Sequence, residues 1–307
     1  MTEYVIETEN LTKKYKDKTV VNNINMKVEK GKIYGLLGKN GAGKTTTMRM
    51  LLNMATKTSG KIMLFGNIPD NSTYRKIGSI IETPGFYENL TAEENLKIIS
   101  KIRGNYSKEN IDEILTSVSL DDNNKKYRDF SLGMKQRLGI AAAIMHNPEL
   151  LILDEPINGL DPIGIKKIRH LLKRLSRENA TTILISSHIL SEIENLADII
   201  GVMDNGQLIT ELTKDELNSQ LNKSVIFEVS DPNKSEMILE SIGLHKGRDY
   251  KTKKPDTIYL YSNLDLRDRI NEIFVKNGIK VKGIIPCEEN LEEYFTRIIN
   301  PETELAA

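Results

Sequence analysis

The residues with the clearest chemical potential lie near the N-terminus, where positions 38–45 read GKNGAGKT. This is a complete G-x-x-x-x-G-K-[ST] pattern, in which glycines let successive backbone N–H groups turn inward around phosphate oxygens. The ammonium group of Lys44 supplies a point charge for the outer phosphates, and the hydroxyl of Thr45 suits one coordination position of Mg²⁺. The pattern predicts that the chain binds a nucleoside triphosphate.

The segments on both sides of this loop are of the required types. An apolar run at 33–37 predicts a strand, and residues 46–52 predict a helix whose N-terminus faces the phosphates. A glycine-rich turn without a ligand would not need this order of strand, loop and helix. The residues expected to contact the nucleotide here are Gly38, Asn40, Gly41, Ala42, Gly43, Lys44, Thr45 and Thr46.

Two acidic residues follow a second apolar run, at 150–153. Ligands of an open parallel sheet bind at the carboxyl ends of its strands. We therefore expect Asp154 to hold Mg²⁺ beside Thr45, directly or through water, and Glu155 to polarise the water that attacks the γ-phosphate. Without the phosphate loop the pair would equally suit a solvated acidic turn, so the prediction depends on both motifs.

The elements that must position these groups are those of an α/β fold. Alternating apolar and polar residues at 4–9 and 20–28 predict strands of a half-exposed sheet. Continuous apolar runs at 150–153 and 182–186 predict buried parallel strands. The helical pattern at 163–178 between them completes a βαβ crossover.

A helical segment and a second small domain complete the expected organisation. The pattern is helical from about Ala92 to Met145, and Thr91 with Glu94 predicts a capping box at its start. Beyond residue 215 we expect strand 224–229, helix 234–242, strand 257–261, helix 265–277, strand 279–284 and helix 290–299. These patterns predict a nucleotide-binding domain at 1–215, with a helical subdomain at about 88–145, and a C-terminal α+β domain at 216–307.

Composition narrows the classes of function. The formal net charge is zero, so bulk electrostatics does not predict a nucleic-acid partner. A single cysteine, Cys287, agrees with a reducing cytosolic compartment. The N-terminus does not read as a secretory signal, and the apolar stretches are far shorter than the roughly 18–20 residues that span a bilayer. If the protein works at a membrane, another chain must supply the membrane part.

Residues 130–137, FSLGMKQR, resemble the L-S-G-G-Q signature of ATP-binding cassette (ABC) ATPases. With the other motifs in order, the resemblance covers residues 4–215. It implies a P-loop ABC fold, with a parallel core sheet, an antiparallel β subdomain and a helical subdomain. It also implies a head-to-tail dimer, in which Ser131 and Gly133 of one copy close on the γ-phosphate held by the other. Leu132 and Met134 replace the glycine and glutamine that the family prefers, and Ser131 alone would suit a helix N-cap.

The same resemblance assigns three more residues. His188 resembles the switch histidine that contacts the γ-phosphate, where the plainer interpretation is a polar residue at a helix start. Asp161 resembles the D-loop aspartate at the dimer interface, and an Asp-Pro turn into a helix with Pro162 at its first position is compatible with that role. Tyr15 resembles the aromatic residue that stacks on adenine, the alternative being an exposed strand tyrosine. No N-K-x-D guanine-reading sequence is visible, which favours ATP.

Glu82 narrows the resemblance to a subgroup of the family, because most members have glutamine at this position. A carboxylate can still approach Mg²⁺ or the attacking water, the alternative being an acidic loop residue without a contact. Glu82, the following PGFY and the terminal NLEEYF at 290–295 resemble the bacitracin-resistance and lantibiotic-immunity subgroup of exporters. Phe86 and Tyr87 are expected either to line a groove for a permease helix or to pack against the chain's own helical subdomain.

The resemblance therefore implies an ATP-hydrolysing subunit, with ATP and Mg²⁺ as cofactors, that drives export of peptide antibiotics. It would be peripheral on the inner face of the cell membrane, working as a dimer with separate permease subunits and without nucleic acid. The alternatives are an ABC ATPase that is not coupled to transport, export of another substrate, or a regulatory nucleotide sensor. The chain has one cassette and no inserted heptads, which disfavours an ATPase that is not coupled to transport. The presence of Glu155 and His188 disfavours a nucleotide sensor.

Overall fold

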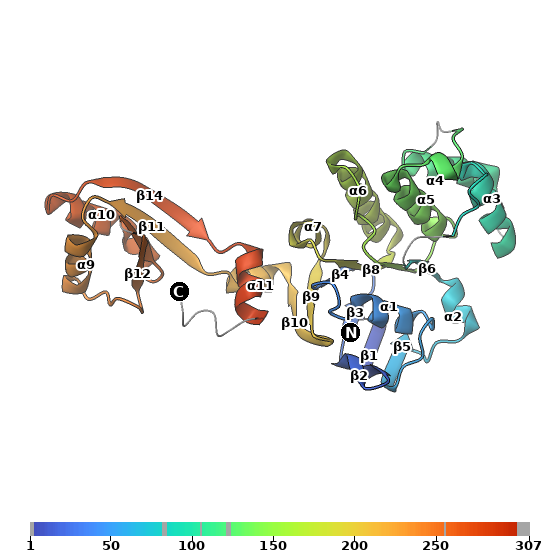
Figure 1. Cartoon of the computed structure of the whole chain (residues 1–307), viewed down its shortest axis with the longest axis horizontal. Helices are drawn as coiled ribbons and strands as arrows, with labels where there is room; N and C mark the ends of the chain where they lie inside the picture. Colours follow the sequence, from blue (N-terminus) through green and yellow to red (C-terminus); the bar gives the residue numbers. More distant parts are fainter. Residues whose placement is uncertain (1–2, 82–84, 105, 121–123, 255, 300–307) are drawn as a thin grey trace. The chain divides into compact units, whose positions relative to one another are not determined.

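The computed structural model describes residues 3–81, 85–104, 106–120, 124–254 and 256–299 (Figure 1). It divides into two compact units, Met1–Asp215 and Glu216–Ala307. Each unit has its own cluster of buried apolar side chains. No helix within the described ranges is long and apolar enough to cross a bilayer.

The first unit is built on a six-stranded sheet in the order β10-β9-β4-β8-β7-β6. Its strands are β4 (Ile33–Leu37), β6 (Ile77–Ile80), β7 (Leu150–Leu153), β8 (Thr182–Ser187), β9 (Ile199–Asp204) and β10 (Gln207–Thr213). All neighbours run parallel except β10, which lies antiparallel to β9 at one edge. Every residue of β4, β7 and β8 is buried, which explains their continuous apolar sequences. The parallel registers bring the carboxyl ends of these three strands to one edge.

An antiparallel sheet forms the second layer of this unit. The long strand β1 (Tyr4–Tyr15) pairs with β2 (Lys18–Ile24), β3 (Lys27–Glu29) and β5 (Ser59–Leu64). The prediction of a single strand over 20–28 was wrong, because β2 and β3 pair with different ends of β1. The two strands are separated at residues 25–26. Asn23, near the end of β2, has a φ of 52°, in the left-handed region that asparagine tolerates, where the register of β2 against β1 shifts.

Helices surround these sheets, and three of them pack together as the helical segment (Figure 1). The helices are α1 (Lys44–Leu51), α2 (Asn71–Arg75), α3 (Ala92–Arg103), α4 (Lys108–Ser117), η1 (Tyr127–Asp129), α5 (Leu132–Ile144), α6 (Pro162–Asn179) and α7 (Leu190–Leu196). Helix α8 (Lys214–Gln220) runs from the end of this unit into the second. The predicted capping box is confirmed, since Thr91 caps α3 and the Glu94 carboxylate accepts from the Thr91 N–H at 2.8 Å. Pro162 is confirmed at the first position of α6, behind Asp161 as N-cap.

The second unit has the order β-α-β-β-α-β of a ferredoxin-like sandwich. Its elements are β11 (Lys223–Val229), α9 (Pro232–Ser241), β12 (Tyr250–Lys254), β13 (Thr257–Leu260), η2 (Leu264–Leu266), α10 (Arg267–Lys276), β14 (Val281–Glu288) and α11 (Leu291–Ile299). The strands form an antiparallel sheet in the order β12-β13-β11-β14. The predicted order β-α-β-α-β was wrong because it lacked β12. That strand lies at the sheet edge, where a lysine-rich sequence such as YKTKK is tolerated.

The two ends of the second unit are tied together. Tyr294 on α11 donates its hydroxyl hydrogen to the side chain of Gln220, and Arg297 donates to the Gln220 carbonyl at 3.3 Å. Arg297 also pairs with Glu289, whose backbone N–H donates to the carbonyl of Asn222 at 2.8 Å. The chain therefore enters and leaves this unit at the same place.

Candidate active site

The phosphate loop joins β4 to α1, and its flanks are packed while its tip is open. A Cβ atom on Gly38 would lie 2.4 Å from the carbonyl oxygen of Met203, and one on Gly43 would lie 2.8 Å from that of Val20. A Cβ on Gly41 would meet nothing within 4 Å. Gly41 and Gly43 have φ of 87° and 106°, which only glycine adopts readily. Glycine is thus required for packing at the flanks and for backbone conformation at the tip.

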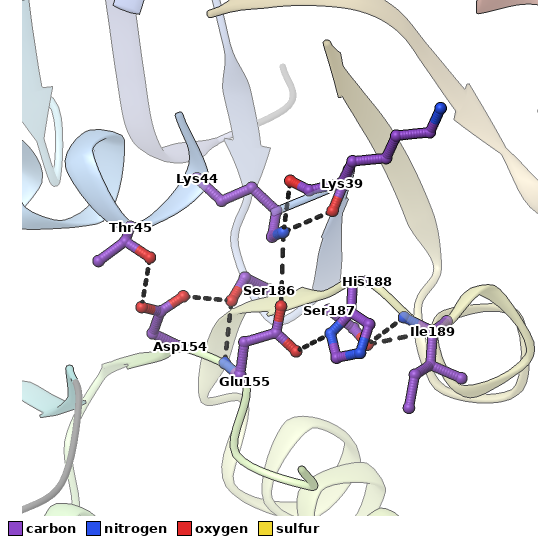
Figure 2. A network of polar contacts seen from close by, with 10 residues as sticks. Lys39, Lys44, Thr45, Asp154, Glu155, Ser186, Ser187, His188 and Ile189 are labelled. Carbon is purple, nitrogen blue, oxygen red and sulfur yellow. Dashed lines mark hydrogen bonds and ion pairs between the residues drawn. The ribbon is translucent and has the colours of Figure 1, made fainter. Parts of the chain in front are cut away.

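Lys44 is the first residue of α1 and is 5% exposed, and the polar contacts of its ammonium group within the described ranges are all with oxygen atoms. It donates to the carbonyl of Gly38 at 2.5 Å and to that of Lys39 at 3.4 Å, and lies 3.4 Å from Oε1 of Glu155 (Figure 2). The N-terminus of α1 has no side-chain cap. A buried ammonium beside uncapped N–H groups is a suitable site for an anion such as a phosphate.

Asp154 lies directly after β7 and connects helix α1 to strand β8. Its Oδ2 accepts from the Thr45 hydroxyl at 2.7 Å, and its Oδ1 accepts from the Ser186 hydroxyl at 2.5 Å. A hydroxyl and a carboxylate this close form a hard-oxygen donor pair of the kind that Mg²⁺ binds together with substrate phosphates. Among the described residues, no group of three or more His, Cys, Asp or Glu side chains could hold a metal alone.

Glu155 lies at the centre of the polar network (Figure 2). Its Oε2 is 2.8 Å from Nδ1 of His188, and its buried Oε1 accepts no hydrogen bond in the described part of the chain. The φ of Glu155 is 48°, a left-handed conformation that costs a non-glycine residue roughly 1–2 kcal/mol. The backbone N–H donates to the Ser186 hydroxyl at 2.9 Å, which stabilises this conformation.

Ser186, at the end of β8, is the residue of this site that sequence reasoning missed. It is fully buried and contacts both acidic residues, as donor to Asp154 and acceptor from the N–H of Glu155. The following Ser187 accepts the Gly38 N–H at its carbonyl at 3.3 Å. The signal was present, because two polar residues end a buried apolar strand directly before His188.

The signature segment lies elsewhere in the same chain. Ser131 is exposed and caps α5, as its plainer interpretation predicted. Leu132 packs over the D-loop, since a Cβ on Gly159 would lie 2.4 Å from its Cδ2, and one on Gly133 would lie 3.2 Å from Leu160. Among the described residues, no hydrogen bond or ion pair joins Ser131 to the phosphate loop.

Asp161 accepts the Gly164 N–H at 2.6 Å as the N-cap of α6 and is likewise outside the polar network. Tyr15 lies at the tip of the β1–β2 hairpin, 47% exposed, with no hydrogen bond or ion pair to the loop in the described ranges. Glu82 lies outside the described residues. Phe86 packs against Tyr127 of the chain's own helical segment, with ring centroids 5.2 Å apart.

Tyr87 differs from its neighbour, because its side chain is 61% exposed. The buried Asn95 of α3 clamps its backbone, accepting the Tyr87 N–H at 2.8 Å and donating to the Tyr87 carbonyl at 3.2 Å. The ring is therefore held at the surface by a rigid backbone.

Comparison with known proteins identifies the fold. The ABC transporter family profile matches residues 21–158. The bacitracin transport ATP-binding protein BcrA of Enterococcus faecalis is 56% identical over 301 residues, 97% of each chain. The lantibiotic transport ATP-binding protein SrtF of Streptococcus pyogenes is 46% identical over 228 residues, 73% of this chain and 99% of that protein.

A solved ABC transporter cassette, described as a dimer, aligns with a TM-score of 0.62 at 25% identity, over 68% of this chain and 98% of that one. The predicted P-loop ABC fold is thereby confirmed. The chain belongs to the ABC transporter family, as one of its ATP-binding and ATP-hydrolysing subunits.

Proposed function

We propose that this subunit drives export of a bacitracin-like or lantibiotic-like peptide antibiotic through separate membrane permease subunits. The 56% identity to the E. faecalis bacitracin transport protein carries the proposal, because it extends over 97% of both chains. It therefore includes the second unit, which the lantibiotic relative is too short to match in full. The subunit would bind the permease at the inner face of the cell membrane.

In this proposal Lys44 binds the outer phosphates and Glu155 accepts the proton of the attacking water. Oε1 of Glu155 supports this role, since it lies 3.4 Å from the Lys44 ammonium but accepts no hydrogen bond among the described residues, which leaves a lone pair for that water. His188 fixes the other carboxylate oxygen and would contact the γ-phosphate. The loop residues Gly38, Asn40, Gly41, Ala42 and Gly43, together with Thr46, would supply the surrounding N–H groups.

Thr45 and Asp154 would hold Mg²⁺, with Glu82 as a third candidate. When bound, the ion neutralises charge on the β- and γ-phosphate oxygens. The 2.7 Å separation of the Thr45 hydroxyl and Asp154 carboxylate suits a shared ion. Tyr15 would stack on the adenine ring.

A second copy would complete the site. Ser131, Gly133 and Asp161 lie outside their own chain's polar network, on the N-termini of α5 and α6. A serine hydroxyl with helix N–H groups is a suitable partner for a γ-phosphate held by another molecule. We assign the exposed Tyr87 to the permease contact, because its rigid backbone presents an aromatic ring to a partner helix.

The proposal is tested by expressing the full chain with its permease in a sensitive Gram-positive host. The minimal inhibitory concentrations of bacitracin, a lantibiotic and an unrelated antibiotic are then compared. We expect resistance to one of the two peptides only, and its loss in Lys44→Ala. ATP hydrolysis without resistance to either peptide would contradict the proposal and favour another substrate or an uncoupled ATPase.

A further inference from the structure

We propose that Lys13 is a positioning residue for the base subsite. Its ammonium group holds the Tyr15 ring in place and ties it to the segment that directly follows the helix carrying the phosphate-binding residues. The inference rests on the proposed function, in which Tyr15 stacks on adenine. It adds a link between the base and phosphate subsites.

Strand pairing fixes the backbone of Tyr15 but leaves its ring exposed. Tyr15 is paired with Lys18 across a two-residue turn, and Lys16 in that turn has a φ of 51°. Such tight turns set the register of the hairpin. The Tyr15 side chain is nevertheless 47% exposed, so an additional contact is needed to fix its rotamer.

Lys13 supplies that contact. Its Nζ lies 4.6 Å from the centroid of the Tyr15 ring and donates to the carbonyl oxygen of Thr56 at 2.5 Å. A cation within about 6 Å of an aromatic face is attracted by the ring quadrupole. Because the carbonyl holds the ammonium in place, the ammonium in turn holds the ring. The ammonium lies over one face of the ring, and in the proposed function the base would stack on the other.

The carbonyl that anchors Lys13 belongs to Thr56, in the segment that follows helix α1. Thr56 follows closely on α1, where the backbone N–H groups at 54–55 donate to the carbonyl of Arg49 at 2.8 and 3.1 Å. The same helix begins with Lys44. Lys13 thus connects the aromatic ring on the antiparallel sheet to the segment that directly follows the phosphate-binding helix.

The neighbouring Lys14 offers a matched control. Its backbone N–H donates to the Thr58 hydroxyl at 2.9 Å, while its side chain is exposed and makes no hydrogen bond or ion pair with the described residues. The two lysines therefore share a strand and a charge, but only Lys13 faces the ring.

The test measures equilibrium binding of ATP and of inorganic tripolyphosphate, which has no base, to the full chain. Lys13→Met should weaken ATP binding about two- to tenfold and leave tripolyphosphate binding unchanged. Lys13→Arg should restore most of the affinity, and Lys14→Met should have no effect. In the Tyr15→Leu background, Lys13→Met should add no further loss, because Lys13 acts through the ring.

Equal weakening of both ligands, or additive losses in the double variant, would overturn the inference. An unchanged ATP affinity in Lys13→Met, with a loss in Tyr15→Leu, would overturn it as well and leave the base-stacking role intact. If Tyr15→Leu itself binds ATP normally, the base-stacking part of the proposed function is wrong, and the role of Lys13 is rejected with it.

Discussion

The two units of this chain both place helices against a sheet, yet Lys44, Asp154, Glu155 and His188 meet at the sheet of the first. In the first unit the parallel strands β4, β7 and β8 end at the same edge, and their following residues meet there. In the second unit all neighbouring strands are antiparallel, so successive strand ends alternate between opposite edges. Strand direction, more than the layer arrangement, decides where polar side chains converge.

Glu155→Gln should give the largest effect, because it removes the base while preserving shape. We expect kcat for ATP hydrolysis to fall by about 10²–10⁴ with ATP binding retained. Phosphate release and equilibrium binding measure the two effects separately. Normal phosphate release would show that another group accepts the proton.

Ser186→Ala tests whether the site at the carboxyl ends of the parallel strands depends on the buried Ser186 hydroxyl. Asp154 and the backbone of Glu155 would both lose a partner, at a cost of about 1–3 kcal/mol in the free energy of unfolding. We expect kcat to fall about tenfold. Ser187→Ala is the control, because its hydroxyl contacts only Ile189 among the described residues. Equal losses in the two variants would contradict a specific role for Ser186.

A pair of core variants tests whether the units are energetically separate. Phe274→Ala, in the second core, should cost about 3–5 kcal/mol of that unit's stability and leave kcat unchanged. Leu184→Ala, in β8, should instead destabilise the first unit and reduce turnover. Calorimetry resolves the two transitions. Loss of turnover in the Phe274 variant would break the contrast between the units.

A further effect concerns pH and His146, which follows helix α5 by two residues. Burial, together with the nearby Arg103, lowers the pKa of His146 to about 4, below the roughly 6.5 of an unfolded chain. Its Nε2 lies 3.2 Å from the carbonyl of Ile77. The unfolded chain therefore binds a proton first, and the free energy of unfolding should fall as pH drops from about 6.5 to about 4.

In His146→Gln this contribution should disappear, because the amide can still donate to Ile77 but does not titrate. Melting temperatures measured across that pH range provide the check. An identical pH dependence in both proteins would show that other groups titrate in this range.

Features encoded by adjacent residues were predictable from the sequence. The capping box of Thr91 with Glu94 and the entry of Pro162 into α6 involve partners within four positions of each other. The phosphate loop and the approach of Asp154 to Thr45 were also foreseeable, because parallel strands share one edge.

Features that depend on distant partners were not predictable. Ser186 meets Asp154 across 32 positions, and its hydroxyl gives no local pattern. The left-handed backbone of Glu155 is stabilised by a different bond to the same hydroxyl, from its own N–H, and glutamate has no local preference for that conformation. Strand β12 was missed because an edge strand lacks the apolar alternation that a covered strand requires.

The closure of the second unit on Gln220 has an evolutionary consequence. Because Tyr294 and Arg297 close on Gln220 within the unit itself, the unit can be gained or lost as a whole in one genetic step. The alignment with the S. pyogenes relative covers 73% of this chain and 99% of that shorter protein. This difference in length is what such a gain or loss would produce. A gene fusion that transfers residues 216–307 onto a shorter cassette would recreate that event in the laboratory.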